Sequence, residues 1–137
     1  MKQLKEELFS RELTCLVVWE HGRFESQKRG VAPLMELLSS EGSCQGGKAA
    51  DKVVGRATAF LYRLLEIAQL HAGVISQGAL EVLQESNICV TYDTLVPGIR
   101  NRTNTGPCPM EAATANCHTP EEAFAAIRAT LDKLSKA

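Results

Sequence analysis

The stretch that decides the fold runs from Ala72 to Tyr92 and reads "AGVISQGALEVLQESNICVTY". Its first five residues are apolar or small without alternation, which is typical of a strand buried on both faces. "GALEVLQES" then has helical spacing, and "ICVTY" is a second run rich in β-branched residues. A strand, a helix and a strand in this order predict a right-handed crossover between parallel strands. The stretch therefore indicates an α/β fold.

Further elements are predicted on both sides of this unit. "TCLVVW" and "RFESQ", within residues 14–27, predict a hairpin of two strands, and the opening residues predict a short amphipathic helix. A small helix is predicted over 31–38. A last helix is predicted after Thr119, where Glu122 would complete a capping box.

A long helix is predicted between the glycine-rich segment and Ala72. Its apolar positions recur at helical spacing: Ala50, Val53, Val54, Ala57, Phe60, Leu61, Leu64, Leu65 and Ala68. We therefore expect residues 1–137 to form one α/β domain, with a mixed β-sheet and helices packed on its faces.

Composition excludes several classes of partner. The chain has 15 basic and 16 acidic residues, so duplex nucleic acid is not expected. The longest apolar runs, such as Leu16–Trp19, are far shorter than the roughly 20 residues of a membrane span, and the opening residues lack the pattern of a signal peptide. We expect a soluble cytoplasmic protein. The cysteine count of five fits reduced thiols, with Cys15 and Cys89 in strands predicted to be buried.

The segment Gly42–Lys52, "GSCQGGKAADK", raises the question of a phosphate-binding loop because it begins G-x-x-x-x-G-K-A. A P-loop follows a buried strand and has Ser or Thr after the Lys to hold magnesium. Here Ala49 takes that place and the preceding residues have a helical pattern, so a nucleotide triphosphatase is not predicted. A glycine-rich turn leading into a helix could still hold an anion, and a flexible connector is the alternative.

The connection "VPGIRNRTNTGPCPME", residues 96–111, is long for a small domain, and such loops are often functional. Arg100 and Arg102 suit a phosphate or carboxylate. Cys108 would gain thiolate character at the start of a following helix. The alternative is a surface loop with a buried cysteine. No C-x-x-C or H-x-x-x-H spacing occurs, so we expect no metal and no cofactor.

These residues also carry a resemblance. "ADKVVGRA", residues 50–57, together with "LVP", "NR", "TG" and "CPME" between Leu95 and Glu111, resembles a small family of uncharacterised bacterial and archaeal proteins with a cytidine-deaminase-like fold. Zinc deaminases open one helix with His-x-Glu and the next with Pro-Cys-x-x-Cys. Here the corresponding helices would open with "AADKV" and "SQGAL". The resemblance therefore implies a deaminase-like pocket without zinc and without zinc-dependent deamination.

The resemblance implies where the pocket would lie. Asp51 and Lys52 would stand at the mouth of the long helix, facing Ser76 at the end of a strand. The loop residues expected to fold over this pocket are Asn101, Arg102, Thr105 and Cys108.

Three functions follow as hypotheses. The first is the binding of a small polar metabolite, similar to a nucleoside or nucleotide, by Ser76 and the loop. The second is an enzyme with Cys108 as nucleophile and Lys52 or Asp51 as acid or base. The third is a structural dimerisation module, which leaves a homodimer open as a partner.

Overall fold

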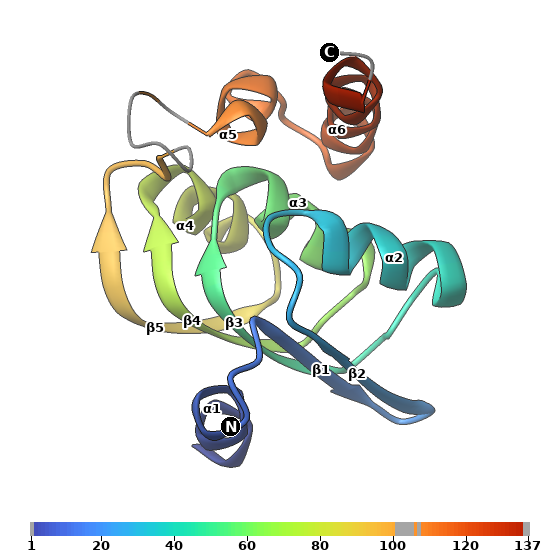
Figure 1. The fold of residues 1–137 in the computed structure, drawn as a ribbon, viewed down its shortest axis with the longest axis vertical. Coiled ribbons are helices and arrows are strands. Elements are labelled where there is room, and N and C mark those ends of the chain that lie inside the picture. Colours follow the sequence, from blue (N-terminus) through green and yellow to red (C-terminus); the bar gives the residue numbers. More distant parts are fainter. Residues whose placement is uncertain (1, 101–105, 107, 136–137) are drawn as a thin grey trace.

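The computed structural model describes residues 2–100, 106 and 108–135 (Figure 1). The elements follow one another as α1 (Lys2–Ser10), β1 (Cys15–Trp19), β2 (Gly22–Ser26), α2 (Ala32–Glu41), β3 (Lys48–Val54), α3 (Arg56–Leu64), β4 (Gln69–Ser76), α4 (Gln77–Gln84), β5 (Cys89–Val96), α5 (Pro109–Thr114) and α6 (Pro120–Ser135).

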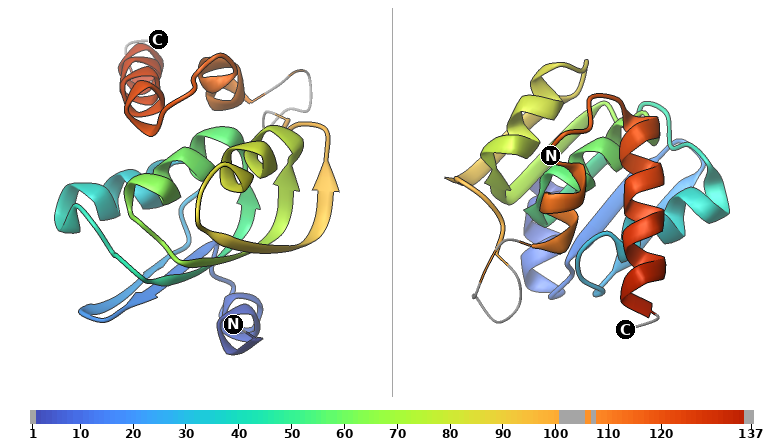
Figure 2. Two further views of the ribbon diagram at one scale, coloured as in Figure 1. Left: turned by 180° about the vertical axis from the view of Figure 1, so that it is seen from behind. Right: turned by 90° about the horizontal axis from the view of Figure 1, so that it is seen from above.

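The described strands form one mixed sheet in the order β2-β1-β3-β4-β5. β1 is antiparallel to both of its neighbours, and β3, β4 and β5 are parallel to one another. Helices α2, α3 and α4 cover one face of the sheet, and α5 and α6 lie beyond them (Figure 1). Helix α1 lies on the opposite face of the sheet (Figures 1 and 2). The α/β class and the mixed sheet are therefore as predicted.

The prediction of a helix from Ala50 is wrong for its first residues. Residues 48–54 form β3, which pairs with β1 on one side and with β4 on the other, and the helix begins only at Arg56. The neighbouring residues Ala49 and Ala50 are both fully buried, so the start of this central strand has no alternation that would separate it from a buried helix. Gly55, in an extended conformation, marks the change from strand to helix.

The glycine-rich segment leads into this strand and not into a helix. The residues after Gly46 and Gly47 enter β3, not a helix. A turn that leads into a strand has no helix N-terminus to offer an anion. The hypothesis that this segment holds an anion at a helix start is therefore wrong, and the segment connects α2 to β3.

The capping box predicted at the start of the last helix is confirmed. The backbone N–H of Thr119 donates to Oε1 of Glu122 at 3.1 Å, and the N–H of Glu122 donates to Oγ1 of Thr119 at 3.2 Å, as in a capping box. The prediction of a buried strand holds for Cys15 but is wrong for Cys89, which is exposed because β5 is an edge strand. Within the described residues, no helix has the length and apolar character to cross a bilayer.

Candidate functional site

Strands β3 and β4 end side by side, and a helix begins directly after each. α3 begins at Arg56, and α4 begins at Gln77 after Ser76 as its N-cap. Because the two strands are parallel neighbours, both helix starts lie at the same edge of the sheet. In open α/β sheets, ligands bind outside this carboxyl edge. We therefore take it as the candidate site.

The side chain of Arg56 joins three segments of this edge. Its Nε donates to the carbonyl oxygen of Thr114 at 2.8 Å, and its Nη2 donates to that of Cys117 at 2.7 Å. Nη1 donates to the carbonyl oxygen of Gly78 at 3.2 Å. The guanidinium carbon lies 5.3 Å from the ring centre of Phe60. With only 14% of the side chain exposed, this charge is satisfied inside the protein and holds the α5–α6 segment against α3 and α4.

The carboxylate of Glu111, in α5, lies at the start of α3. Its Oε1 accepts a hydrogen bond from the backbone N–H of Arg56 at 3.1 Å. Gly55, the N-cap residue, has no side chain of its own to do this, and a Cβ at Gly55 would lie 2.7 Å from that oxygen. The glycine thus leaves room for the carboxylate, which is favoured by the partial positive charge at a helix N-terminus.

Two of the predicted site residues lie near this edge. Ser76 is fully buried, and its Oγ accepts a hydrogen bond from the N–H of Ala79 at 3.1 Å. Cys108 is partly exposed, directly before α5, and its N–H donates to the carbonyl oxygen of Ile99 at 2.9 Å. The other predicted ligand-binding residues lie outside the described part of the chain: Asn101, Arg102 and Thr105.

Asp51 and Lys52 do not stand at the mouth of a helix, as was predicted, because both belong to β3. Lys52 is exposed. Asp51 lies between Cys15 of β1 and Ala72 of β4 in the sheet and is only 8% exposed. The misplaced helix start caused this error.

Asp51 belongs to a buried chain of polar groups between the sheet and α3. The hydroxyl of Tyr62 donates to its Oδ2 at 2.7 Å and lies 3.4 Å from Sγ of Cys15. Burial raises the pKa of Asp51 to about 7, and the hydrogen bonds from the Tyr62 hydroxyl and the Val53 N–H act in the opposite direction. Burial also raises the pKa of the Cys15 thiol well above its usual range. These groups are suited to holding a proton inside the core.

No metal centre is apparent in the part of the chain that the structure describes. There, no three His, Cys, Asp or Glu side chains come together where they could hold an ion. Cys117 and His118, with Cys108, do not form such a group.

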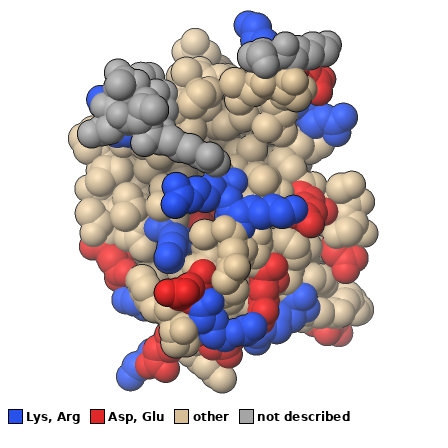
Figure 3. All heavy atoms as spheres, in the orientation of Figure 1, with Lys and Arg blue, Asp and Glu red and all other residues tan. Residues whose placement is uncertain are grey.

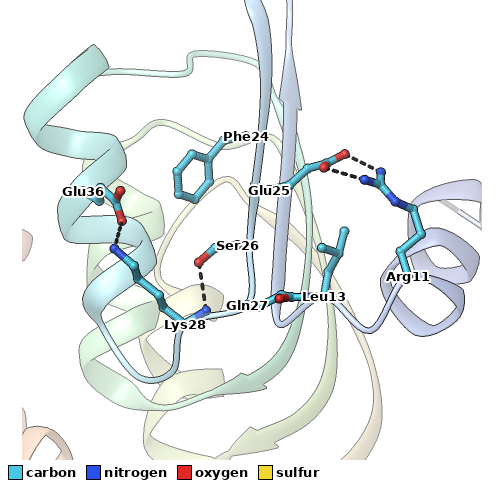
Figure 4. Close-up of a pocket in the computed structure, with 8 residues that line it drawn as sticks. All are labelled: Arg11, Leu13, Phe24, Glu25, Ser26, Gln27, Lys28 and Glu36. Carbon is cyan, nitrogen blue, oxygen red and sulfur yellow. Dashed lines mark hydrogen bonds and ion pairs between the residues drawn. The ribbon is translucent and has the colours of Figure 1, made fainter.

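Cavities occur away from the predicted site. One of about 630 Å³ lies beside the end of β2, between α2 and the end of α1 (Figure 4). It is lined by Arg11, Leu13, Phe24, Glu25, Ser26, Gln27, Lys28 and Glu36. Its charges are already paired: Arg11 contacts both carboxylate oxygens of Glu25, at 2.5 and 2.7 Å, and Lys28 lies 3.0 Å from Glu36.

A second cavity, of about 400 Å³, lies between α2, α3 and α6 and is lined mainly by apolar atoms, including those of Met35, Leu64 and Phe124. No predicted site residue lines either cavity.

On the face seen in Figure 3, basic side chains gather in the centre and acidic side chains are mixed with them below.

Sequence reasoning missed the residues that organise this edge. Arg56 and Glu111 are both inside the quoted motifs "ADKVVGRA" and "CPME", but they were given no part in the site. The signal available was Gly55 followed by Arg56 directly after an apolar run, which marks a strand end and a helix start. Tyr62 could not be linked to Asp51 while both were assigned to one helix.

The comparisons with known proteins agree with this description of the fold. A family profile described as TM1506, a domain of unknown function (DUF1893), matches residues 3–131. The crystal structure of a DUF1893 family protein (TM1506) from Thermotoga maritima, at 2.70 Å resolution, superposes with a TM-score of 0.85 and 28% sequence identity. The match covers 96% of this chain and 88% of that one. No match is found among curated proteins.

Proposed function

Because the chain belongs to the DUF1893 family, whose function is unknown, we propose a function from its own geometry: it binds a small polar metabolite, similar to a nucleoside or nucleotide, at the carboxyl edge of β3 and β4. The binding site in this proposal needs no metal. The fold is proposed to be of the cytidine-deaminase-like kind, and the protein is proposed to act in the cytoplasm.

The observation that carries this proposal is the pair formed by Arg56 and Glu111. The Glu111 carboxylate is held on the backbone N–H of Arg56, the first of α3, and the guanidinium of Arg56 binds backbone carbonyls, at the edge where open α/β sheets bind their ligands. Polar groups placed close together can fix the orientation of a polar ligand. Ser76 and Cys108 flank this edge, and the proposal adds Asn101, Arg102 and Thr105 from the connection that follows β5.

The deaminase-like part of the proposal concerns the two helix starts. Zinc deaminases hold their metal with His and Cys at two such positions. Here α3 begins with Arg56 and α4 begins with Gln77, and neither is a zinc ligand. The same edge would therefore recognise a ligand by hydrogen bonds and charge, not by a metal-activated water.

The experiment is to identify what the protein retains. Native mass spectrometry of protein purified from cells is expected to show a bound small molecule, and nucleosides and nucleotides are then tested by thermal shift. A ligand that binds only the folded state raises the melting temperature. The Arg102→Ala variant should lose this shift, whereas Arg128→Ala, in α6, should keep it. No retained molecule and no shift with any compound would contradict the proposal.

A second candidate is an enzyme with Cys108 as nucleophile and Lys52 or Asp51 as acid or base. The specific observation is that Cys108 is partly exposed and directly precedes α5, whereas Cys15 and Cys44 are buried. An activated cysteine reacts faster than its exposure predicts. Cys89 is the control because it is more exposed.

Alkylation rates, mapped by peptide mass spectrometry near neutral pH, test this candidate. Cys108 should react faster than Cys89, and Lys52→Met should slow the reaction of Cys108. If Cys108 reacts no faster than Cys89 or Cys117, the nucleophile hypothesis fails and binding remains.

A further inference from the structure

The two edges of the sheet differ in how well they are protected. β2 is a short edge strand whose Arg23 and Glu25 pair with each other, and they also pair with Glu7 of α1 and with Arg11 just after it. β5 is longer, and all of its residues except Val90 and Val96 are exposed. Among the described residues, β5 has a strand neighbour on one side only, which is β4. Two opposite views show no other described helix or strand along its outer side (Figures 1 and 2).

β5 lacks the Pro and basic residues that often protect an edge strand from pairing. Its sequence, "CVTYDTLV", contains no Pro, Lys or Arg. Its one charge, on Asp93, is bound by Lys5 of α1 at 2.8 Å and lies 3.4 Å from Nε2 of His71. Tyr92 and Leu95 each leave 41% of their surface exposed. A long edge strand without Pro, Lys or Arg offers its backbone to another strand.

We propose that β5 is the interface of a homodimer, in which the β5 strands of two copies pair antiparallel and join two sheets into one. A second copy fits this edge because the strand matches itself. A two-fold axis brings the same strand from each copy into an antiparallel pair, as in other self-complementary dimer interfaces. Strand addition of this kind satisfies the outward backbone N–H and C=O groups.

The register of the pair follows from geometry and charge. Residues directly opposite each other share a face of the sheet, and side chains alternate between faces, so a two-fold axis normal to the sheet must pass beside one residue and its own copy. The two copies of this eight-residue strand overlap most when the axis passes beside Tyr92 or beside Asp93. A centre at Asp93 would place two carboxylates opposite each other, which is unfavourable. The structure therefore assigns the centre to Tyr92.

This register gives favourable pairs along the strand. The two Tyr92 rings lie opposite each other, and Thr91 lies opposite the copy of Asp93, where a hydroxyl can donate to the carboxylate. Cys89 lies opposite the copy of Leu95. Aromatic, hydrogen-bonded and apolar cross-strand pairs each stabilise a sheet.

Light scattering across a range of concentrations tests the interface. The wild-type protein should have twice the mass of the 14.9 kDa chain. Tyr92→Lys places two like charges opposite each other and should shift the mass to that of one chain. Leu95→Lys is a second variant of the same edge. Leu134→Lys is the matched control, since Leu134 is 52% exposed but lies on α6, and it should remain dimeric.

Cross-linking tests the register. In a background with Cys89 replaced by Ser, the Tyr92→Cys variant should form a disulfide between two copies on oxidation, and the Asp93→Cys variant should not. The linked peptides are identified by mass spectrometry. Circular dichroism confirms that each variant is folded.

Three results would each overturn the proposal. The first is a wild-type protein that is monomeric at every concentration. The second is a dimer that survives both Lys substitutions in β5 or that is lost in Leu134→Lys. The third is cross-linking through Asp93→Cys in place of Tyr92→Cys.

Discussion

The phenol hydroxyl of Tyr62 donates a hydrogen bond to Oδ2 of Asp51 over 2.7 Å, and this contact connects α3 to the middle of β3. Tyr62 is fully buried, and Asp51 is 8% exposed. Burial of a carboxyl group disfavours its charged form, and here it outweighs the hydrogen bonds that favour the carboxylate. The fold thus contains a carboxyl group that changes its charge near neutral pH.

The first prediction concerns the pH dependence of stability. The pKa of Asp51 rises from 3.8 to about 7 on folding, so between these values the folded state keeps a proton that the unfolded state has lost. The stabilisation from Asp51 is fully present below pH 3.8 and is lost as the pH rises through about 7. Relative to Asp51→Asn, the wild-type free energy of unfolding should fall over this window by on the order of a few kcal/mol.

Urea denaturation of both proteins at several pH values measures this difference. Asp132→Asn, which changes an exposed carboxyl group on α6, is the control and should show no such trend. Tyr62→Phe removes a hydrogen bond that lowers the pKa of Asp51, so it should move the window to higher pH. If the difference in the free energy of unfolding between the wild-type protein and Asp51→Asn does not change with pH, the prediction is wrong.

The second prediction concerns Arg56. Arg56→Lys keeps the charge but cannot reach the carbonyl oxygens of Gly78, Thr114 and Cys117 together. Hydrogen bonds to charged groups are strong, and buried carbonyls left without a partner are costly, so we expect a loss of about 2–4 kcal/mol in the free energy of unfolding. Hydrogen exchange in α5 should also become faster, because the hydrogen bonds from Arg56 that hold this helix in place are weakened.

The control is Arg128→Lys. Arg128 is exposed and stacks on Phe124 at 5.9 Å, so its replacement should cost about 0.5 kcal/mol or less. Equal losses for both variants would show that the three carbonyl contacts of Arg56 do not stabilise the fold.

The class of the fold could be predicted because its signals are local. The run from Ala72 to Tyr92 has a strand, a helix and a strand with clear boundaries, and the structure has β4, α4 and β5 there. Residues 50–54 could not be assigned in the same way. Ala49 packs in the main core and Ala50 packs with Leu4 and Leu8 of α1, and this burial on both faces erases the period that distinguishes a strand from a helix.

The candidate site depended on that one assignment. With Asp51 and Lys52 at a helix start, the sequence placed them in a pocket, whereas β3 places Asp51 inside the core and exposes Lys52. The contacts of Arg56 with Thr114 and Cys117 join residues 58 and 61 positions apart, and no local pattern encodes them.

The third prediction tests the capping box at the start of α6, which sequence and structure share. Thr119→Ala removes the oxygen that accepts from the N–H of Glu122 and should cost about 1 kcal/mol. Thr119→Ser keeps that oxygen and should retain most of the stability. Thermal denaturation compares the two variants, and equal melting temperatures would show that the cap does not contribute.

The last prediction is a double-mutant cycle at the start of α3. Gly55→Ala adds a Cβ that would lie 2.7 Å from Oε1 of Glu111, so the carboxylate must move away and the cap on the Arg56 N–H is lost. Glu111→Ala loses the same cap directly, at a cost of about 1 kcal/mol. In the double variant the clash is absent and the cap can be lost only once. Its cost should therefore be smaller than the sum of the single costs by roughly 1 kcal/mol. Urea denaturation of the four proteins measures this coupling, and additive costs would show that Gly55 and Glu111 act independently.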